Sequence, residues 1–157
     1  MLYWDSVRCS AGYDLFLTFD KDRVYEIASS RPENLIQKPL AERFAYMAEY
    51  LKDCSGQPML IEALEDLDLS WTTPFSMAVY RALALIPFGF TVTYGELAAL
   101  AGHPGAFRAV GTAMSKNRFL IIVPCHRVLA AGGKIGGFSS GLDMKRALLK
   151  VEGHNEF

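Results

Sequence analysis

Val123-Pro124-Cys125-His126-Arg127-Val128 places a cysteine and a histidine side by side, directly after the apolar run 119–123. The proline fixes the local backbone and removes a hydrogen-bond donor, so we expect a buried strand to end there. Cysteine attacks as the thiolate, and a nearby imidazole and Arg127 would make that form accessible at neutral pH. The stretch therefore predicts a nucleophile, Cys125, where a strand meets a loop.

The same stretch also fits a structural site without chemistry. A cysteine after an apolar run is commonly a small buried residue with an inert sulfur. Adjacent side chains on an extended backbone point to opposite faces, so Cys125 and His126 need not touch. The choice between the two interpretations depends on the rest of the chain.

Composition indicates a globular chain with enough length for one domain or two small ones. Its 157 residues are 51% hydrophobic and 21% charged. With neither a targeting segment nor a membrane-length apolar run in the pattern, we expect a cytoplasmic protein without a membrane partner, nucleoid-associated if prokaryotic. Cys9, Cys54 and Cys125 are odd in number and lack paired spacing, which favours reduced thiols. Three histidines without a Cys-x-x-Cys motif predict no metal site, and we expect no cofactor.

Charge is distributed unevenly along the chain. Residues 1–74 carry 7 Lys/Arg and 13 Asp/Glu, a net charge of −6, whereas residues 75–157 carry 9 and 4, a net charge of +5. A basic second half is typical of a nucleic-acid face, and the acidic first half would face away from it.

The first half of the chain predicts a small α+β domain. Runs rich in aromatic and β-branched residues at 2–8, 13–19 and 23–29 indicate three antiparallel strands. Apolar residues at helical spacing indicate a helix over 40–51. Segment 60–71 predicts a further strand joined to an acidic linker.

The second half predicts helices with clear start signals. Thr73-Pro74 is a cap and first-turn pair for a helix over 75–86. Thr93-Tyr94-Gly95-Glu96 is a capping box, so a helix begins at Tyr94 and ends at Gly102. A second helix over 106–115 follows a glycine-containing turn, which makes a helix-turn-helix candidate.

These patterns together predict an α+β protein. Its N-terminal antiparallel sheet with a helix spans 1–70. A mainly helical domain resembling a winged helix-turn-helix spans 71–157.

The C-terminal half closely resembles the O6-alkylguanine-DNA alkyltransferase family, the methylated-DNA–protein-cysteine methyltransferases. The match runs from Trp71 to Gly153 and is specific because Pro-Cys-His-Arg-Val occurs together with other family motifs in the family's order. These motifs are Pro74-Phe75, Ile86-Pro87-Phe88-Gly89, Thr93-Tyr94-Gly95-Glu96, Arg108-Ala109-Val110-Gly111, Asn117, Gly136-Gly137-Phe138-Ser139 and Glu152-Gly153.

The resemblance implies repair of DNA by irreversible transfer of an alkyl group from O6-alkylguanine, or from O4-alkylthymine, to Cys125 in a single turnover. The base must leave the stack, because a protein sulfur cannot reach its alkyl carbon inside a duplex. His126 would act as a base through a water, oriented by Glu152. Tyr94 would donate a hydrogen bond to N3 of guanine as it leaves.

The resemblance also implies two larger sets of residues. Arg108 would enter the stack as a finger, and Asn117 would brace the turn around the nucleophile. The residues assigned to the DNA-binding site are Arg108, Ala109, Gly111, Thr93, Asn117 and Arg127. The residues assigned to the substrate pocket are Met114, Val128, Phe138, Ser139 and Ser140.

Two positions depart from the family pattern. Phe138 stands where a tyrosine is common, so a phenolic contact to the base is lost. Ser140 stands where glycine is common, so extra atoms at the pocket rim could narrow the entrance to bulky adducts.

Two other classes of function fit parts of the pattern. A cysteine hydrolase or acyltransferase could use the same Cys-His-Glu relay with turnover. A noncatalytic helix-turn-helix module could bind DNA with Cys125 as a structural residue. For the repair activity, the partner would be double-stranded DNA containing alkylated bases, and we expect a monomer.

Overall fold

Short runs of aromatic and β-branched residues form the N-terminal sheet in the computed structural model, which describes residues 1–53 and 60–157. The strands are β1 (Tyr3–Arg8), β2 (Asp14–Phe19), β3 (Val24–Ala28) and β4 (Ile36–Gln37). β1, β2 and β3 form the predicted antiparallel meander, and the sheet order is β3-β2-β1-β4. β4 pairs parallel with β1 and was not predicted, because two exposed residues carry no hydrophobic pattern.

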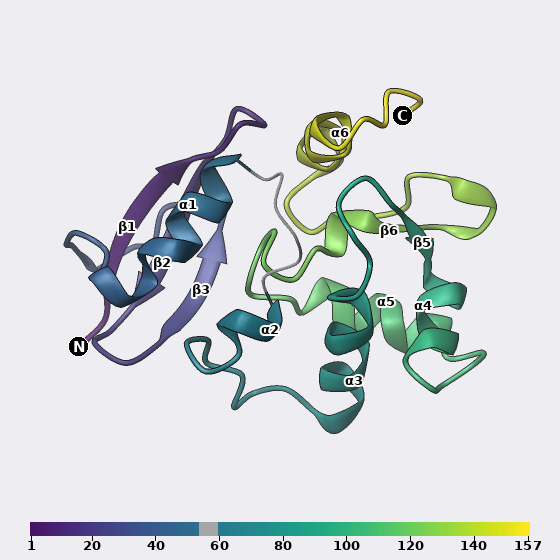
Figure 1. The fold of residues 1–157 in the computed structure, drawn as a ribbon, viewed down its shortest axis with the longest axis horizontal. Helices are drawn as coiled ribbons and strands as arrows, with labels where there is room; N and C mark the ends of the chain where they lie inside the picture. Colours follow the sequence, from purple (N-terminus) through teal and green to yellow (C-terminus); the bar gives the residue numbers. More distant parts are fainter. Residues whose placement is uncertain (54–59) are drawn as a thin grey trace.

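The predicted helix after the sheet is present and begins with a 3₁₀ turn. That turn spans Glu42–Phe44 and continues into α1 (Ala45–Asp53), which lies across one face of the sheet (Figure 1). Met47 and Leu51 are fully buried on the sheet-facing side of α1. The hydroxyl of Ser10, in the turn between β1 and β2, donates to the carbonyl of Asp53 and so holds the end of α1.

The strand predicted within 60–71 is wrong for the residues described there. Leu60–Ala63 forms α2, a short helix, and Leu67 makes only an isolated bridge with Val24 of β3. The edge of β3 therefore receives a single bridge from this segment rather than a continuing ladder. Cys54 lies outside the described residues.

The second half contains the predicted helices with the predicted caps. Thr73 accepts a hydrogen bond from the Ser76 amide, and Thr93 and Glu96 form the capping box. The helices are α3 (Pro74–Leu83), α4 (Tyr94–Leu100), α5 (Phe107–Ser115) and α6 (Leu142–Val151). Two short strands, β5 (Val92–Thr93) and β6 (Val128–Leu129), pair in parallel, and Ala131–Gly133 forms a 3₁₀ turn. The α+β class is confirmed.

Helices α4 and α5 form the predicted helix pair. The turn between them contains Gly102 and Gly105, both at positive φ, a conformation that glycine adopts without steric cost. His103 in this turn packs edge-on against the ring of Phe75 at a centroid distance of 5.0 Å. This contact packs the turn against α3, which also bonds to α5 through Tyr80 and Ala113.

The buried strand predicted before Cys125 is wrong. The run 119–123 is buried throughout, but Ile121 takes a φ of +71° and folds the chain back, so that Leu120 bridges Val123. Cys125–Arg127 is a 3₁₀ turn. A run this apolar is buried in either conformation, so its composition could not distinguish a strand from a turn.

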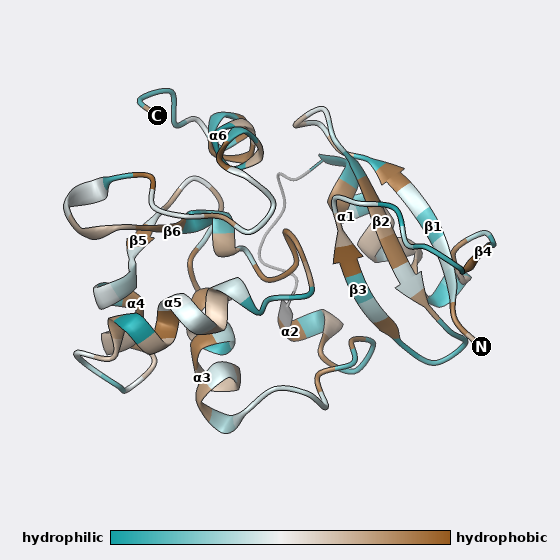
Figure 2. Ribbon diagram, turned by 180° about the vertical axis from the view of Figure 1, so that it is seen from behind, coloured by the Kyte–Doolittle hydropathy of each residue, from teal (hydrophilic) through white to brown (hydrophobic). Residues whose placement is uncertain are grey.

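This folded-back run joins the two halves of the molecule. The amide of Ile27 in β3 donates to the carbonyl of Arg118 at 2.7 Å, and the amide of Leu120 donates to the carbonyl of Ile27 at 3.1 Å. Figure 2 shows hydrophobic residues along β2 and β3, and the buried side chains of both halves form one continuous cluster. The segment that leads to Cys125 is therefore anchored in the core.

Tyr80 links α3 to α5 and gives a test of this packing. Its fully buried hydroxyl donates to the carbonyl of Ala113 at 2.8 Å. We expect Tyr80→Phe to lower the free energy of unfolding by about 1–3 kcal/mol, because a buried carbonyl loses its partner. Urea denaturation measures this. Tyr25→Phe, which removes a part-buried hydrogen bond to Asp20, serves as the control and should cost less.

Candidate functional site

Cys125 lies at a pocket of about 170 Å³. One side of the pocket comes from the last turns of α5, and the other from the loop after the 3₁₀ turn of 131–133. The lining residues are Tyr94, Gly111, Met114, Ser115, Cys125, Gly137, Phe138 and Ser139. The thiol is buried at the pocket wall, so it meets only a group that enters this pocket.

Asn117 holds the turn that presents the thiol. Its amide Nδ2 donates to the carbonyl of Val123 at 3.1 Å and lies 3.3 Å from Sγ of Cys125. Its Oδ1 accepts from the amide of Phe119 at 2.9 Å. One half-buried side chain thus bonds to both arms of the turn and to the sulfur. The sequence analysis assigned Asn117 both to bracing this turn and to the DNA-binding site. Its hydrogen bonds go to the backbone of the turn and to the sulfur, as the bracing assignment predicts.

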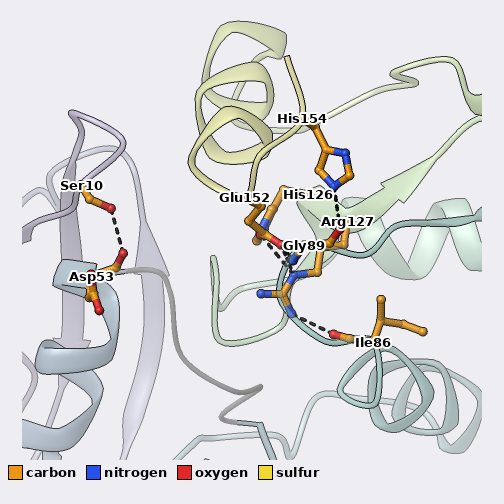
Figure 3. Close-up of polar contacts among 8 residues, drawn as sticks. All are labelled: Ser10, Asp53, Ile86, Gly89, His126, Arg127, Glu152 and His154. Carbon is orange, nitrogen blue, oxygen red and sulfur yellow. Dashed lines mark hydrogen bonds and ion pairs between the residues drawn. The ribbon is translucent and has the colours of Figure 1, made fainter. Parts of the chain in front are cut away.

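Glu152 organises the groups behind Cys125. Its carboxylate accepts from Nε of Arg127 at 2.8 Å and from the amide of Gly89 at 2.8 Å, and it also contacts Nε2 of His126 (Figure 3). Nη1 of Arg127 donates to the carbonyl of Ile86 at 2.9 Å. The relay residues His126 and Glu152 are therefore together, and both are buried.

The loop before β5 supplies the backbone part of this network. Gly89 has a φ of +85°, donates to Glu152 through its amide, and accepts from Nε2 of His154 through its carbonyl at 3.0 Å (Figure 3). Glu152 caps the end of α6, so α6 and this loop are connected at two points. The motif Pro87-Phe88-Gly89 acts here as a carboxylate-binding turn.

The electrostatics of the network favour an ionised Glu152 and a neutral His126. Burial alone would raise the pKa of Glu152, but His126, Arg127 and the Gly89 amide together hold it below its usual value. Burial lowers the pKa of His126. A neutral ring that donates from Nε2 to Glu152 has a lone pair on Nδ1, which is buried and has no hydrogen-bond partner among the described residues.

The sequence predicted an accessible thiolate, and this is wrong for the unliganded pocket. Burial raises the pKa of Cys125, while Asn117 and the charge of Lys145 oppose the increase. The thiolate is disfavoured because a charged sulfur would lose its hydration in this site. Cys125 is therefore expected to be a protonated thiol at neutral pH.

Tyr94 follows the cap residue Thr93 and lines the pocket. Burial raises the pKa of its phenol, with a further increase from the nearby Cys125 sulfur. The hydroxyl consequently keeps its proton at neutral pH and can act as a hydrogen-bond donor.

Three of the five residues assigned to the substrate pocket line it, namely Met114, Phe138 and Ser139. Val128 is fully buried in β6 and does not reach the pocket, because its side chain belongs to the core. Ser140 lines a neighbouring hollow of about 210 Å³ instead. The sequence missed Ser115 and Gly137, which carry no chemical signal of their own.

Arg108 and Ala109 lie exposed on the first turn of α5, where a duplex could reach them. Gly111 lies on the same helix and lines the pocket, and the Thr93 side chain is occupied in capping α4. The assignment of Arg127 to the DNA-binding site is wrong, because its guanidinium is buried and bound to Glu152 and Ile86.

Lys145 is a buried residue of the site that the sequence analysis missed. Its ammonium donates to the carbonyl of Val128 at 2.7 Å and to that of Gly137, in the pocket wall, at 3.0 Å. Burial lowers its pKa to about 8, and the nearby Cys125 sulfur partly offsets this. The signal was present in the sequence, because Lys145 falls at helical spacing with the buried Leu148 and Leu149 of α6.

The pocket wall also needs a glycine at one position. Gly136 has a φ of +69°, and a Cβ there would lie 3.2 Å from the amide nitrogen of Ala130. Both the positive φ and the close approach to Ala130 therefore favour glycine at position 136.

Two other kinds of feature are absent from the described residues. In 1–53 and 60–157, no helix is long and apolar enough to cross a membrane. The same residues contain no group of three or more His, Cys, Asp or Glu side chains placed to hold a metal ion.

Comparison with known proteins gives a consistent picture. The family model described as "6-O-methylguanine DNA methyltransferase, DNA binding domain" matches residues 74–154. The methylated-DNA–protein-cysteine methyltransferase of Methanosarcina acetivorans is 56% identical over 81 residues, which are 52% of this chain and 52% of that protein. The chain spans about half the length of this relative in the match.

Solved structures match over nearly the whole chain. A crystal structure of Mycobacterium tuberculosis OGT in complex with DNA is 32% identical, covers 96% of this chain and 92% of that one, and gives a TM-score of 0.72. The O6-methylguanine-DNA methyltransferase of Pyrococcus kodakaraensis is 28% identical, covers 98% of this chain and 100% of that one, and gives a TM-score of 0.75.

The buried ammonium of Lys145 predicts a pH dependence of stability. Between a folded pKa of about 8 and the usual value of 10.5, the unfolded chain holds a proton that the folded chain has released. Because the unfolded chain binds one more proton than the folded chain in this window, the free energy of unfolding increases as the pH rises from about 8 to 10.5. We expect the difference in unfolding free energy between wild type and Lys145→Met, measured by urea denaturation, to increase from pH 8 to 10.5. A difference that stays constant across this range would contradict the assignment.

Proposed function

The chain belongs to the family of 6-O-methylguanine DNA methyltransferases, and we propose that it repairs DNA by transferring an alkyl group from O6 of guanine to Cys125. The observation that carries the proposal is the placement of Cys125 on the wall of a small pocket, backed by the buried network of His126, Arg127 and Glu152. Methylated-DNA–protein-cysteine methyltransferase is accordingly the activity that we assign.

In the proposed reaction, Sγ of Cys125 attacks the alkyl carbon on O6 of the flipped guanine. A sulfur–carbon bond forms while the carbon–oxygen bond breaks, and its electron pair remains on guanine. The thiol proton passes through a water to Nδ1 of His126, and the imidazolium then returns this proton to the guanine anion, which restores both the neutral base and the neutral imidazole. Water does not cleave the resulting thioether, so each molecule reacts once.

The surrounding residues would lower the barrier for this step. Glu152 would stabilise the imidazolium that forms on His126, because its carboxylate already contacts Nε2. Tyr94, which keeps its proton, would donate to N3 of the departing guanine. Asn117 and Lys145 would stabilise charge on the sulfur as its proton leaves.

The partner in this proposal is double-stranded DNA that carries an alkylated base. Arg108 and Ala109 are exposed at the start of α5, and the second half of the chain carries a net charge of +5 against −6 for residues 1–74. Arg108 would fill the space that the flipped base leaves. The capping residue Thr93 and pocket residue Gly111 would lie against the same strand.

We also propose the division into domains 1–70 and 71–157, with the alkyl transfer and DNA binding assigned to the second. A monomer satisfies the mechanism, because every proposed catalytic group comes from one chain. Action on genomic DNA implies a cytoplasmic location.

Mass spectrometry after incubation with duplex DNA containing O6-methylguanine tests the proposal directly. We expect the mass of one methyl group on the peptide containing Cys125 and none on those containing Cys9 or Cys54. Cys125→Ser should abolish transfer while leaving the fold and DNA binding intact, because serine fits the same space but its oxygen is a far weaker nucleophile. Methylation recovered from the serine variant would refute the role of Cys125.

The same measurement separates the two other classes of function. A hydrolase or acyltransferase would return unmodified Cys125 with multiple turnovers of product. A noncatalytic binding module would leave both the protein and the DNA unchanged.

The proton relay predicts an order among variants. His126→Ala should slow methyl transfer more than Glu152→Gln, because the imidazole takes the proton whereas the carboxylate orients and polarises it. Single-turnover rates measured against pH give the comparison, after circular dichroism has established that both variants fold. A Glu152→Gln profile that matches wild type would reduce the relay to Cys125 and His126.

Arg108 predicts a difference between substrates. Arg108→Ala should impair transfer from duplex DNA by about 1–3 kcal/mol, the scale of one stacking contact. Reaction with free O6-benzylguanine should change little, since no base has to be extruded. Equal losses on both substrates would show that Arg108 acts within the pocket.

A further inference from the structure

The four residues 115–118, at the end of α5, alternate between the pocket and the outer surface. Ser115 lines the pocket, and Asn117 turns inward to the sulfur of Cys125. Lys116 and Arg118 are exposed and, together with Trp71, line an open hollow of about 480 Å³. The surface of Trp71, Lys116 and Arg118, called here the α5 basic patch, therefore adjoins the pocket.

The arginine of this patch is held in place by an aromatic ring. The guanidinium of Arg118 lies over the indole of Trp71, 4.5 Å from the ring centroid. The indole is itself fixed, because its N–H donates to the carbonyl of Asp68 at 2.9 Å and its ring packs against Tyr80. Arg118 thus presents its donors with less rotamer freedom to lose on binding than an isolated surface arginine.

Neither cation of the patch is neutralised by the described part of the chain. Lys116 and Arg118 form no ion pair there, whereas Arg8, Lys52 and Arg146 each pair with a carboxylate. The carboxylate of Asp68, beside Trp71, accepts from the hydroxyl of Ser70 at 2.7 Å. Among the described residues, these two cations therefore face solvent without an acidic partner, and one of them is held against an aromatic ring.

We propose that the α5 basic patch binds the phosphodiester backbone of duplex DNA beside the flipped nucleotide. This rests on the proposed function, because DNA whose base enters the pocket must pass over the end of α5. The bound group is phosphate and not a stacked base, since Arg118 already covers the face of Trp71. Lys and Arg contacts to phosphate are independent of sequence, which suits a protein that searches all of its DNA.

The test compares DNA affinity at several salt concentrations, using fluorescence anisotropy with a duplex that contains no alkylated base. The double variant Lys116→Gln/Arg118→Gln should bind more weakly at low salt. Affinity falls as salt rises, and the plot of log affinity against log salt has a negative slope. The magnitude of this slope should be smaller for the double variant than for wild type by about 2, because each lost phosphate contact reduces it by about 1.

A matched control removes the same charges elsewhere. Lys38 is exposed after β4 and lies over the ring of Tyr3 at 4.6 Å, and Arg31 lies over the ring of Trp4 at 4.6 Å, much as Arg118 lies over Trp71. Lys38→Gln/Arg31→Gln should keep the wild-type slope. A patch variant whose slope equals that of wild type, or whose decrease is matched by this control, would overturn the proposal.

Two further measurements keep the outcome interpretable. The rate at which iodoacetamide modifies Cys125 reports whether the pocket is intact. Arg118→Gln could change the iodoacetamide rate by disturbing the neighbouring Asn117. In that case the single variant Lys116→Gln is used for the salt titration, and its slope should be smaller than that of wild type by about 1. An unchanged slope for Lys116→Gln would then reject the proposed phosphate contact. Methyl transfer by the wild-type protein is measured separately. If wild type transfers no methyl group, the proposed function is wrong. If the patch variant keeps the wild-type salt slope, the proposed phosphate contact is wrong.

Discussion

The buried carboxylate of Glu152 is the constraint on which the site depends. It binds His126 and Arg127 from the turn after Cys125 and the amide of Gly89 from the loop before β5, so three distant segments meet at one group. Each partner satisfies a charge or dipole that burial would otherwise make costly, and removing one member of such a network typically costs about 3–5 kcal/mol. The hydrogen bonds that hold His126 against Glu152 therefore also connect three segments of the fold.

The turn that carries Cys125 complements this network. Ile121 at positive φ reverses the chain, and Asn117 ties both arms together while contacting the sulfur. A turn places the thiol on a pocket wall, whereas a continuing strand would have paired its backbone and hidden it. Burial raises the pKa of Cys125, which favours the protonated thiol in this pocket.

Local signals made the second half of the chain predictable. Thr73-Pro74 and the Thr93–Glu96 capping box specify helix starts through contacts within a few residues, and those starts were placed correctly. The reversal at Ile121 and the buried roles of Arg127 and Lys145 depend on tertiary contacts that no local pattern encodes. The sequence analysis placed Arg127 in the DNA-binding site, whereas its guanidinium is buried against Glu152. The pairing of Glu152 with His126, 26 residues apart, came from family resemblance and not from spacing.

The edge of the N-terminal sheet has one more consequence. Along β3, the amides and carbonyls of Val24 and Ile27 that face away from β2 are taken up by backbone groups of Asp66, Asp68, Arg118 and Leu120. Two of these partners belong to the segment that leads to Cys125. A fragment ending before that segment would expose unpaired backbone beside the apolar residues of β3, a surface that templates intermolecular β-pairing. We therefore expect the N-terminal half to aggregate when it is made alone, because its solubility depends on backbone partners from the half that contains Cys125.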